Sequence, residues 1–147
     1  MKIKIEIIPE LVETEITIQA KEMTDEIKNI ERFISLYYVS LSVKKDQRNF
    51  NISPQEIYYI DAVDHDVFVY TKHDVYETSY KLYQLEEMYP SILLRVNKNT
   101  LINHKMIHSF KSSINGRMEA ELKNKDRIII SRMYVPKLKA LLKGDNI

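Results

Sequence analysis

The chain of 147 residues contains no cysteine. Disulfide bonds, thiolate nucleophiles and cysteine-ligated zinc sites are therefore excluded, and an intracellular protein fits this composition. Glycine occurs only twice, which is too few for the glycine-rich loops that hold nucleotide phosphates. The first residues, MKIKIEIIPE, lack the apolar core of a signal peptide, and no apolar run approaches the length of a membrane span. We therefore expect a cytoplasmic protein that is not inserted in a membrane.

Recognisable sites for catalysis are also missing from the sequence. Asp61, Asp64 and Asp66 cluster, but in a strand and turn their side chains would point in different directions. His104 and His108 have the i, i+4 spacing of a metal pair, which converges on one ion only in a helix, and this segment has the pattern of a turn and a strand. No Ser, His and acid arrangement for nucleophilic catalysis is recognisable. We expect no enzyme activity, no metal and no cofactor.

Charge is distributed unevenly along the chain, although the formal net charge is only +1. Residues 1–92 contain 10 basic and 17 acidic residues, a net charge of −7, whereas residues 93–147 contain 12 basic and 4 acidic residues, a net charge of +8. A basic segment of this kind is typical of a surface that faces a polyanion. Pairing of opposite charges across the fold would explain the same pattern, so charge alone leaves both interpretations open.

The first 40 residues predict a small module of two strands and a helix. Isoleucines alternate with charged residues over 3–7, as in a half-buried strand, and residues 16–20 repeat the alternation. From residue 25 to 40 the apolar residues recur every three or four positions, which predicts an amphipathic helix capped by Thr24. A hairpin with one helix buries too little apolar surface to be stable alone.

The rest of the chain predicts mostly β structure. Runs rich in β-branched and aromatic residues, separated by turn-like residues, predict short strands. These runs are LSVKK (41–45), RNFNIS (48–53), EIYYIDAV (56–63), DVFVYT (66–71), DVYETS (74–79) and residues 106–110, 118–122 and 127–131. Helices are expected at about 79–89, ended by Pro90, and at about 134–143, with Pro136 in the first turn and Gly144 just past the end.

One stretch, LLRVNKNTLINHK (93–105), combines two patterns that seldom occur together. Its apolar residues indicate a strand that enters a core. Between them lies a dense set of hydrogen-bond donors and acceptors, which neither a core strand nor a mobile loop usually carries: Arg95, Asn97, Lys98, Asn99, Thr100 and Asn103. The sequence therefore raises the question of which partner these polar side chains face.

Other stretches occur with this one in a specific order: EIYYIDA (56–62), VFVYT (67–71), LEEMYP (85–90), Ile107, Gly116 and IIISRMYVPKLKALL (128–142). Together, from about Leu41 to Lys143, they resemble the LytTR DNA-binding domain of bacterial response regulators. The resemblance implies a mainly β (α+β) protein. An elongated antiparallel β domain with two helices would occupy residues 41–147, preceded by the strand–strand–helix module of residues 1–40.

The resemblance also implies the function and the residues that carry it. The protein would be a transcription regulator that binds double-stranded DNA with repeated promoter elements, and its inter-strand loops would enter successive major grooves. Base contacts are implied for the loop Asp64-His65-Asp66, for the pair Asn97-Lys98 and for Arg132. Many relatives have His where this chain has Asn97, and an Asn can bond bidentately to adenine. Asp64 and Asp66 carry charges that oppose phosphate.

Further contacts are expected around these positions. Asn99 would face DNA beside Lys98, and phosphate contacts are expected from basic residues of the last third: Lys105, Lys111, Arg117, Lys123 and Lys125. Arg95 and Asn103 are expected to hold the loop through backbone hydrogen bonds. Structural alternatives remain for two base-reading residues, since Arg132 could pair with Glu119 or Glu121 and Lys98 could be a solvated surface lysine.

Residues 1–40 are too short for a phosphoacceptor receiver domain, so we expect control by expression level, self-association or a regulatory partner protein. Because DNA sites of the family are repeated, we expect a homodimer, with packing inside one chain as the alternative. The interface would use apolar residues of the expected helix: Ile27, Ile30, Phe33, Ile34 or Tyr37. An alternative function is a protein-interaction module that titrates a partner without binding DNA, which the acidic residues 1–92 leave open.

Overall fold

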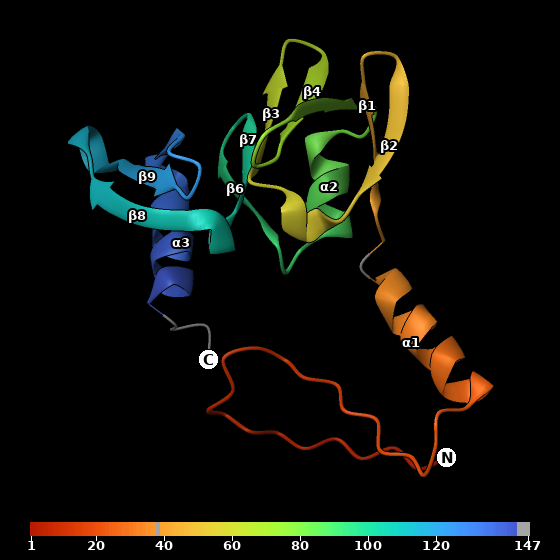
Figure 1. The fold of residues 1–147 in the computed structure, drawn as a ribbon. Coiled ribbons are helices and arrows are strands. Elements are labelled where there is room, and N and C mark those ends of the chain that lie inside the picture. Colours follow the sequence, from red (N-terminus) through yellow and green to blue (C-terminus); the bar gives the residue numbers. More distant parts are fainter. Residues whose placement is uncertain (38, 144–147) are drawn as a thin grey trace.

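The computed structural model describes residues 1–37 and 39–143, and its body consists of two antiparallel sheets that lie side by side (Figure 1). The larger sheet has seven strands in the order β2-β1-β5-β4-β3-β7-β6, and the smaller has three in the order β10-β9-β8. The strands are β1 (Leu41–Lys45), β2 (Arg48–Ile52), β3 (Tyr59–Val63), β4 (Asp66–Tyr70), β5 (Val75–Thr78), β6 (Leu93–Asn97), β7 (Thr100–Asn103), β8 (Ile107–Ser112), β9 (Met118–Leu122) and β10 (Arg127–Ile130).

Three helices accompany the sheets: α1 (Asp25–Tyr37), α2 (Leu82–Met88) and α3 (Val135–Leu142). Helix α2 buries Leu82 and Leu85 in a core with the larger sheet, whereas α3 buries Val135 and Leu138 in a second core with the smaller sheet. The mainly β fold with two helices after residue 41 is therefore confirmed. Gly144, expected just past the last helix, lies outside the described residues.

The strands β6 and β7 contribute to both cores. Successive side chains of a strand point to opposite faces of its sheet, so Leu101 packs in the first core and Ile102 in the second. Leu93 and Leu94 divide between the two cores in the same way. Burial on both faces explains why this stretch is so apolar. Its exposed polar side chains, Lys98 and Asn99, lie in the turn between the strands.

The predicted strands over residues 3–7 and 16–20 are wrong, because residues 1–24 form no strand. Ile3, Ile5 and Ile7 are each 82% exposed, so none of the described residues covers the face that a half-buried strand would bury. Alternation marks which face of a strand would be apolar, but a two-stranded ribbon without a covering layer is only marginally stable. An exposed ion pair between Glu13 and Lys105, at 3.6 Å, links this segment to the body of the protein.

The helix after this segment is confirmed in type and start. It begins at Asp25, and the Thr24 hydroxyl oxygen accepts a hydrogen bond from the backbone N–H of Ile27 at 3.3 Å, as a capping residue does. It ends at Tyr37, three residues before the expected end at residue 40. In the described parts of the chain, no helix is long and apolar enough to cross a membrane.

Candidate nucleic-acid interface

Three segments that carry the predicted base-reading residues are joined by backbone hydrogen bonds. The turn between β6 and β7, which carries Lys98, lies in the middle. On one side the carbonyl oxygen of Asn99 accepts a hydrogen bond from the N–H of Ala62, just before the turn that carries His65, at 2.8 Å. On the other side the carbonyl oxygen of Val96 accepts one from the N–H of Ser131, at 2.8 Å, directly before Arg132. The fold therefore fixes the backbone of the three segments relative to one another.

The turn between β6 and β7 is braced by its own side chains. The Asn97 amide oxygen accepts from the N–H of Asn99 at 2.9 Å, and its NH₂ group donates to the carbonyl oxygen of Ile129 at 3.1 Å. The Arg95 guanidinium donates to the carbonyl oxygen of Lys98 at 2.7 Å and pairs with the Glu86 carboxylate. The Lys98 side chain is exposed and, among the described residues, has no ion pair, so it projects from a rigid turn.

Side-chain hydrogen bonds define the structural roles of Arg95, Asn97 and Asn103. Arg95 and Asn103 hold backbone as expected: the buried Asn103 side chain donates to the carbonyl oxygen of Ile57 at 2.9 Å and accepts from the N–H of Lys105 at 3.1 Å. Asn97 already uses one amide hydrogen and one lone pair inside the protein, so a bidentate base contact would require its remaining hydrogen and lone pair. Its base contact remains a prediction.

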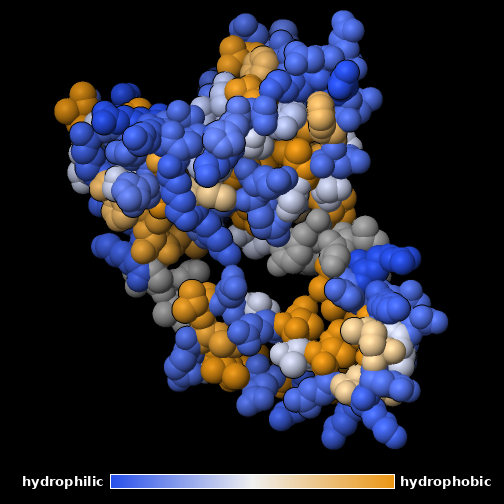
Figure 2. Space-filling model, in the orientation of Figure 1, coloured by the Kyte–Doolittle hydropathy of each residue, from blue (hydrophilic) through white to orange (hydrophobic). Residues whose placement is uncertain are grey.

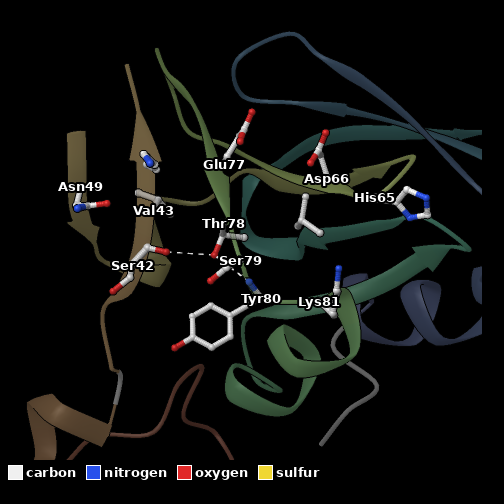
Figure 3. Close-up of a pocket in the computed structure, with 12 residues that line it drawn as sticks. Ser42, Val43, Asn49, His65, Asp66, Glu77, Thr78, Ser79, Tyr80 and Lys81 are labelled. Atoms are coloured by element: carbon white, nitrogen blue, oxygen red, sulfur yellow. Dashed lines mark hydrogen bonds between the residues drawn. The ribbon is translucent and has the colours of Figure 1, made fainter. Parts of the chain in front are cut away.

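The turn between β3 and β4 presents His65 at an exposed position. Asp64 has a positive φ of 58°, a backbone conformation that Asp and Asn adopt more readily than most residues. The backbone conformation therefore explains why an aspartate occupies position 64, independently of any contact with DNA. His65 lines a cleft with Asp66, Lys81 and residues of β1 and β5 (Figure 3). The strands β1 and β5, which line the cleft, pair at a single position, Lys44 with Glu77.

Arg132 begins the short 3₁₀ turn after β10 and is exposed. Within the described residues it pairs with neither Glu119 nor Glu121; Glu119 instead pairs with Lys111 at 3.2 Å. The Arg132 side chain runs over Gly116, where a Cβ atom would lie 2.8 Å from the Arg132 Cδ and 3.0 Å from its Cγ. Gly116 also has a positive φ of 76°. The glycine thus leaves the space in which the arginine side chain lies.

Replacing Gly116 by alanine is expected to lower the free energy of unfolding by about 1–2 kcal/mol, because an L-residue is strained at positive φ. The new Cβ would also displace Arg132. Urea unfolding measures the first effect, and the NMR signal of the Arg132 Nε–H group reports the second. Asn115→Ala is a matched control at a neighbouring positive φ of 59°, and it should leave the arginine signal in place. Unchanged stability and an unchanged arginine signal in Gly116→Ala would contradict this packing.

The distribution of ion pairs favours one interpretation of the uneven charge. The chain has 12 basic residues after position 92. In the described structure only two of them, Arg95 and Lys105, form ion pairs with acidic residues of the segment 1–92. Lys111 pairs with Glu119 inside the basic part. The others have no ion pair among the described residues: Lys98, Arg117, Lys123, Lys125, Arg127, Arg132, Lys137, Lys139 and Lys143. Pairing across the fold therefore explains little of the basic charge, which remains available to a polyanion.

The two sheets are held together by a contact that the sequence did not indicate. The Tyr59 ring of β3 stacks on the Tyr70 ring at 4.2 Å between centroids. Its hydroxyl donates to the Asp126 carboxylate, in the turn between β9 and β10, at 3.2 Å. Burial and the nearby Asp126 charge raise the pKa of Tyr59 above its ordinary value, so the hydroxyl stays protonated as a donor. The contact helps to fix the smaller sheet, which precedes Arg132, against the strands that carry Lys98.

Known proteins are similar to this chain in sequence and in fold. The sensory transduction protein LytT of Bacillus cereus is 27% identical over 123 residues, which cover 83% of this chain and 49% of that protein. The chain therefore spans about half the length of LytT. An uncharacterized HTH-type transcriptional regulator of Staphylococcus aureus strain MSSA476 is 23% identical over 146 residues, covering 97% of this chain and 98% of that protein.

The same similarity appears in three dimensions and at the level of a family. The solved structure of a LytTr DNA-binding domain from Bacillus cereus has a TM-score of 0.66 to this one at 17% identity, and the match covers 70% of this chain and 95% of that chain. The family model of the LytTr DNA-binding domain matches residues 47–143. Because this match covers more than half of the sequence, the chain belongs to the LytTR family of DNA-binding domains.

Proposed function

We propose that the protein is a transcription regulator that binds specific sequences in double-stranded DNA and reads major grooves with its inter-strand loops. The observation that carries this proposal is the set of three connected segments that present His65, Lys98 and Arg132. Family membership supports DNA binding, and the Staphylococcus aureus relative is named as a transcriptional regulator. The exposed basic residues without ion pairs would supply most of the affinity by neutralising phosphates.

Helices α2 and α3 are poorly suited to reading bases. Helix α2 has seven residues and α3 has eight, and each packs its apolar residues into a core. The strands β1–β5 separate α1 from α2, and β6–β10 separate α2 from α3. Among the described residues, therefore, no two helices follow each other as in a helix-turn-helix. Exposed loops are the elements that remain for the grooves.

Each predicted site residue has a proposed role. Lys98 and Arg132 donate to guanine O6 and N7, and His65 contacts an adjacent groove. Asn97 positions the Lys98 turn and offers its remaining amide hydrogen and lone pair to a base. The Asn99 side chain is exposed beside Lys98 and faces the same groove. Basic residues of the smaller sheet and its turns contact phosphates. Lys123 is exposed and has no ion pair among the described residues, and the exposed Lys111 would exchange its contact with Glu119 for a phosphate.

A mobility-shift experiment on the DNA upstream of the protein's own gene tests this function. We expect a retarded band that unlabelled copies of the same DNA remove and unrelated DNA does not. A variant that carries both Lys98→Ala and Arg132→Ala should lose this preference. Failure of the folded wild type to shift this DNA more than unrelated DNA would contradict the proposal and favour the alternative, a module that titrates a protein partner.

The protein is also proposed to act as a homodimer through residues 1–40, followed by the DNA-binding domain of residues 41–147. Helix α1 stands apart from the sheets in Figure 1, and its Ile27, Ile30 and Ile34 remain partly exposed. The side chains of Phe33 and Tyr37, also expected at the interface, lie outside the described part of the structure. Sedimentation of the full chain should show a dimer. A monomer at micromolar concentration, both free and on DNA, would exclude it.

A further inference from the structure

Residues 3–7, with the sequence IKIEI, are exposed, and in a strand their alternation would place apolar and charged side chains on opposite sides. Ile3, Ile5 and Ile7 are each 82% exposed. Figure 1 places residues 1–37 away from the two sheets, and Figure 2 shows apolar residues gathered in that region of the molecular surface. A soluble monomer rarely leaves a large contiguous apolar patch uncovered, so such a patch indicates a binding surface.

The backbone of this segment is also available for pairing. In the described structure no strand forms within residues 1–24. Within residues 1–23 of that structure there is one backbone–backbone hydrogen bond, from the N–H of Leu11 to the carbonyl oxygen of Ile8, at 3.2 Å. Residues 3–7 therefore present unpaired N–H and C=O groups, which is the condition under which one chain adds a strand to another.

We propose that residues 3–7 pair in antiparallel register with the same residues of a second copy, about a two-fold axis through Ile5. Ile5 then lies opposite the partner's Ile5, and Ile3 lies opposite the partner's Ile7. On the other face Lys4 lies opposite the partner's Glu6. The same contacts repeat on both sides of the axis, as an isologous dimer requires. This inference rests on the homodimer of the proposed function and names the contact that forms it.

The charges of Lys4 and Glu6 favour this register over other ways of pairing residues 3–7 between two copies. An axis through Lys4 places Lys4 opposite the partner's Lys4, and an axis through Glu6 places Glu6 opposite the partner's Glu6. A shift by one residue places isoleucines opposite charged side chains, because the side-chain period of a strand is two. Parallel pairing in register stacks equal charges on each other. Only the axis through Ile5 gives every charge of the segment an opposite charge directly across the ribbon, which is the favourable arrangement.

The second alternating segment, residues 16–20, is a weaker partner for this strand. Its sequence ITIQA matches the apolar face, but Thr17 and Gln19 provide no charge opposite Lys4 and Glu6. A two-stranded ribbon still requires a covering layer. The α1 helices of the two copies provide one, because each carries Ile27, Ile30 and Ile34 with partly exposed side chains. A second copy of this chain therefore provides both a hydrogen-bonding partner for residues 3–7 and an apolar surface for α1.

Single introduced cysteines test the register, because the natural chain contains none. In the proposed pairing the Cα atoms of two copies of residue 5 lie about 4.5–5.5 Å apart, within the range of a disulfide. Ile5→Cys should thus form a covalent dimer on mild oxidation of the full chain. Residue 3 lies about 13 Å from the same residue of the partner, four residues along the strand. Ile3→Cys should not crosslink alone, but it should do so when mixed with Ile7→Cys.

Exchange of charges tests the same pairing without oxidation. Lys4→Glu and Glu6→Lys each place equal charges across the ribbon at two positions, so the dimer dissociation constant measured by sedimentation should rise about tenfold or more. The double variant, which has the same composition as the wild type, should restore it. A mixture of the two single variants should form heterodimers. Dissociation constants that are unchanged in both single variants would overturn the proposal.

These experiments distinguish failure of the proposed strand pairing from failure of the homodimer and of DNA binding. If the wild type sediments as a monomer, the homodimer and this contact both fail. If it sediments as a dimer but Ile3→Cys crosslinks as readily as Ile5→Cys, only the register fails. Affinity for DNA, measured on the same samples by a mobility shift, tests the proposed DNA-binding function independently of either result.

Discussion

Raising the monovalent salt concentration from about 50 to about 200 mM is expected to weaken specific DNA binding about a thousandfold. We expect contacts with about six phosphates, each of which changes the slope of log K against log salt by roughly −0.9, for a total slope near −5. The physical reason is the release of counterions when Lys and Arg neutralise phosphates. The basic residues after position 92 that have no ion pair within the described structure are numerous enough for this.

Single lysine variants show where these phosphate contacts are. Lys123→Ala and Lys111→Ala should weaken binding to all sequences alike and each reduce the magnitude of the slope by about one. Lys28→Ala, an exposed lysine on α1, is the matched control and should change neither quantity. Fluorescence anisotropy titrations at several salt concentrations give the slopes. A specific complex with the same affinity across this salt range would contradict the electrostatic part of the account.

Replacing Lys98 or Arg132 by alanine is expected to reduce discrimination against the wrong base by about 1–3 kcal/mol, which is about 5- to 150-fold in relative affinity. Each side chain is exposed on a fixed backbone, Lys98 on a braced turn and Arg132 at the junction after β10. Preference should relax at one or two base pairs for each variant. Nonspecific binding and folding should remain mostly intact, because neither side chain has an ion pair among the described residues.

Titrations against the selected site and its single-base variants, beside thermal melting curves, measure these effects. Arg127→Ala is the matched control, since Arg127 is an exposed arginine at the opposite end of β10. It should leave base preference unchanged. If Arg132 has only a structural role, its loss would lower the melting temperature without altering the base preference of the folded protein. Unchanged base preference in both the Lys98 and Arg132 variants would contradict their assignment.

Most of the β architecture could be predicted because its signals are local. Runs of β-branched and aromatic residues between turn residues predicted the strands after residue 41, and the ordered stretches that include Arg95 and Arg132 indicated the family. The contacts that orient the candidate site are not local. Asn97 bonds to Ile129, 32 residues away, and Tyr59 bonds to Asp126, 67 residues away. No local pattern indicates such pairs, because their partners meet only when the two sheets come together.

The N-terminal residues show where an alternating sequence pattern is not sufficient to predict a strand. The alternation over residues 3–7 would place apolar and charged residues on opposite faces of a strand, but it does not indicate what would cover the apolar face. No described residue of the chain covers it, and Ile3, Ile5 and Ile7 remain exposed. A strand requires hydrogen-bonding neighbours as well as a suitable pattern. The incorrect prediction and the proposed pairing between copies therefore have the same physical origin.

Selection of binding sites from a random pool of double-stranded DNA by the full wild-type chain tests the central claim most directly. We predict that a short repeated element is enriched and that guanines occupy the positions whose preference depends on Lys98 and Arg132. Enrichment no greater than that of the starting pool, with protein that circular dichroism shows to be folded, would contradict the claim that this chain reads DNA sequence.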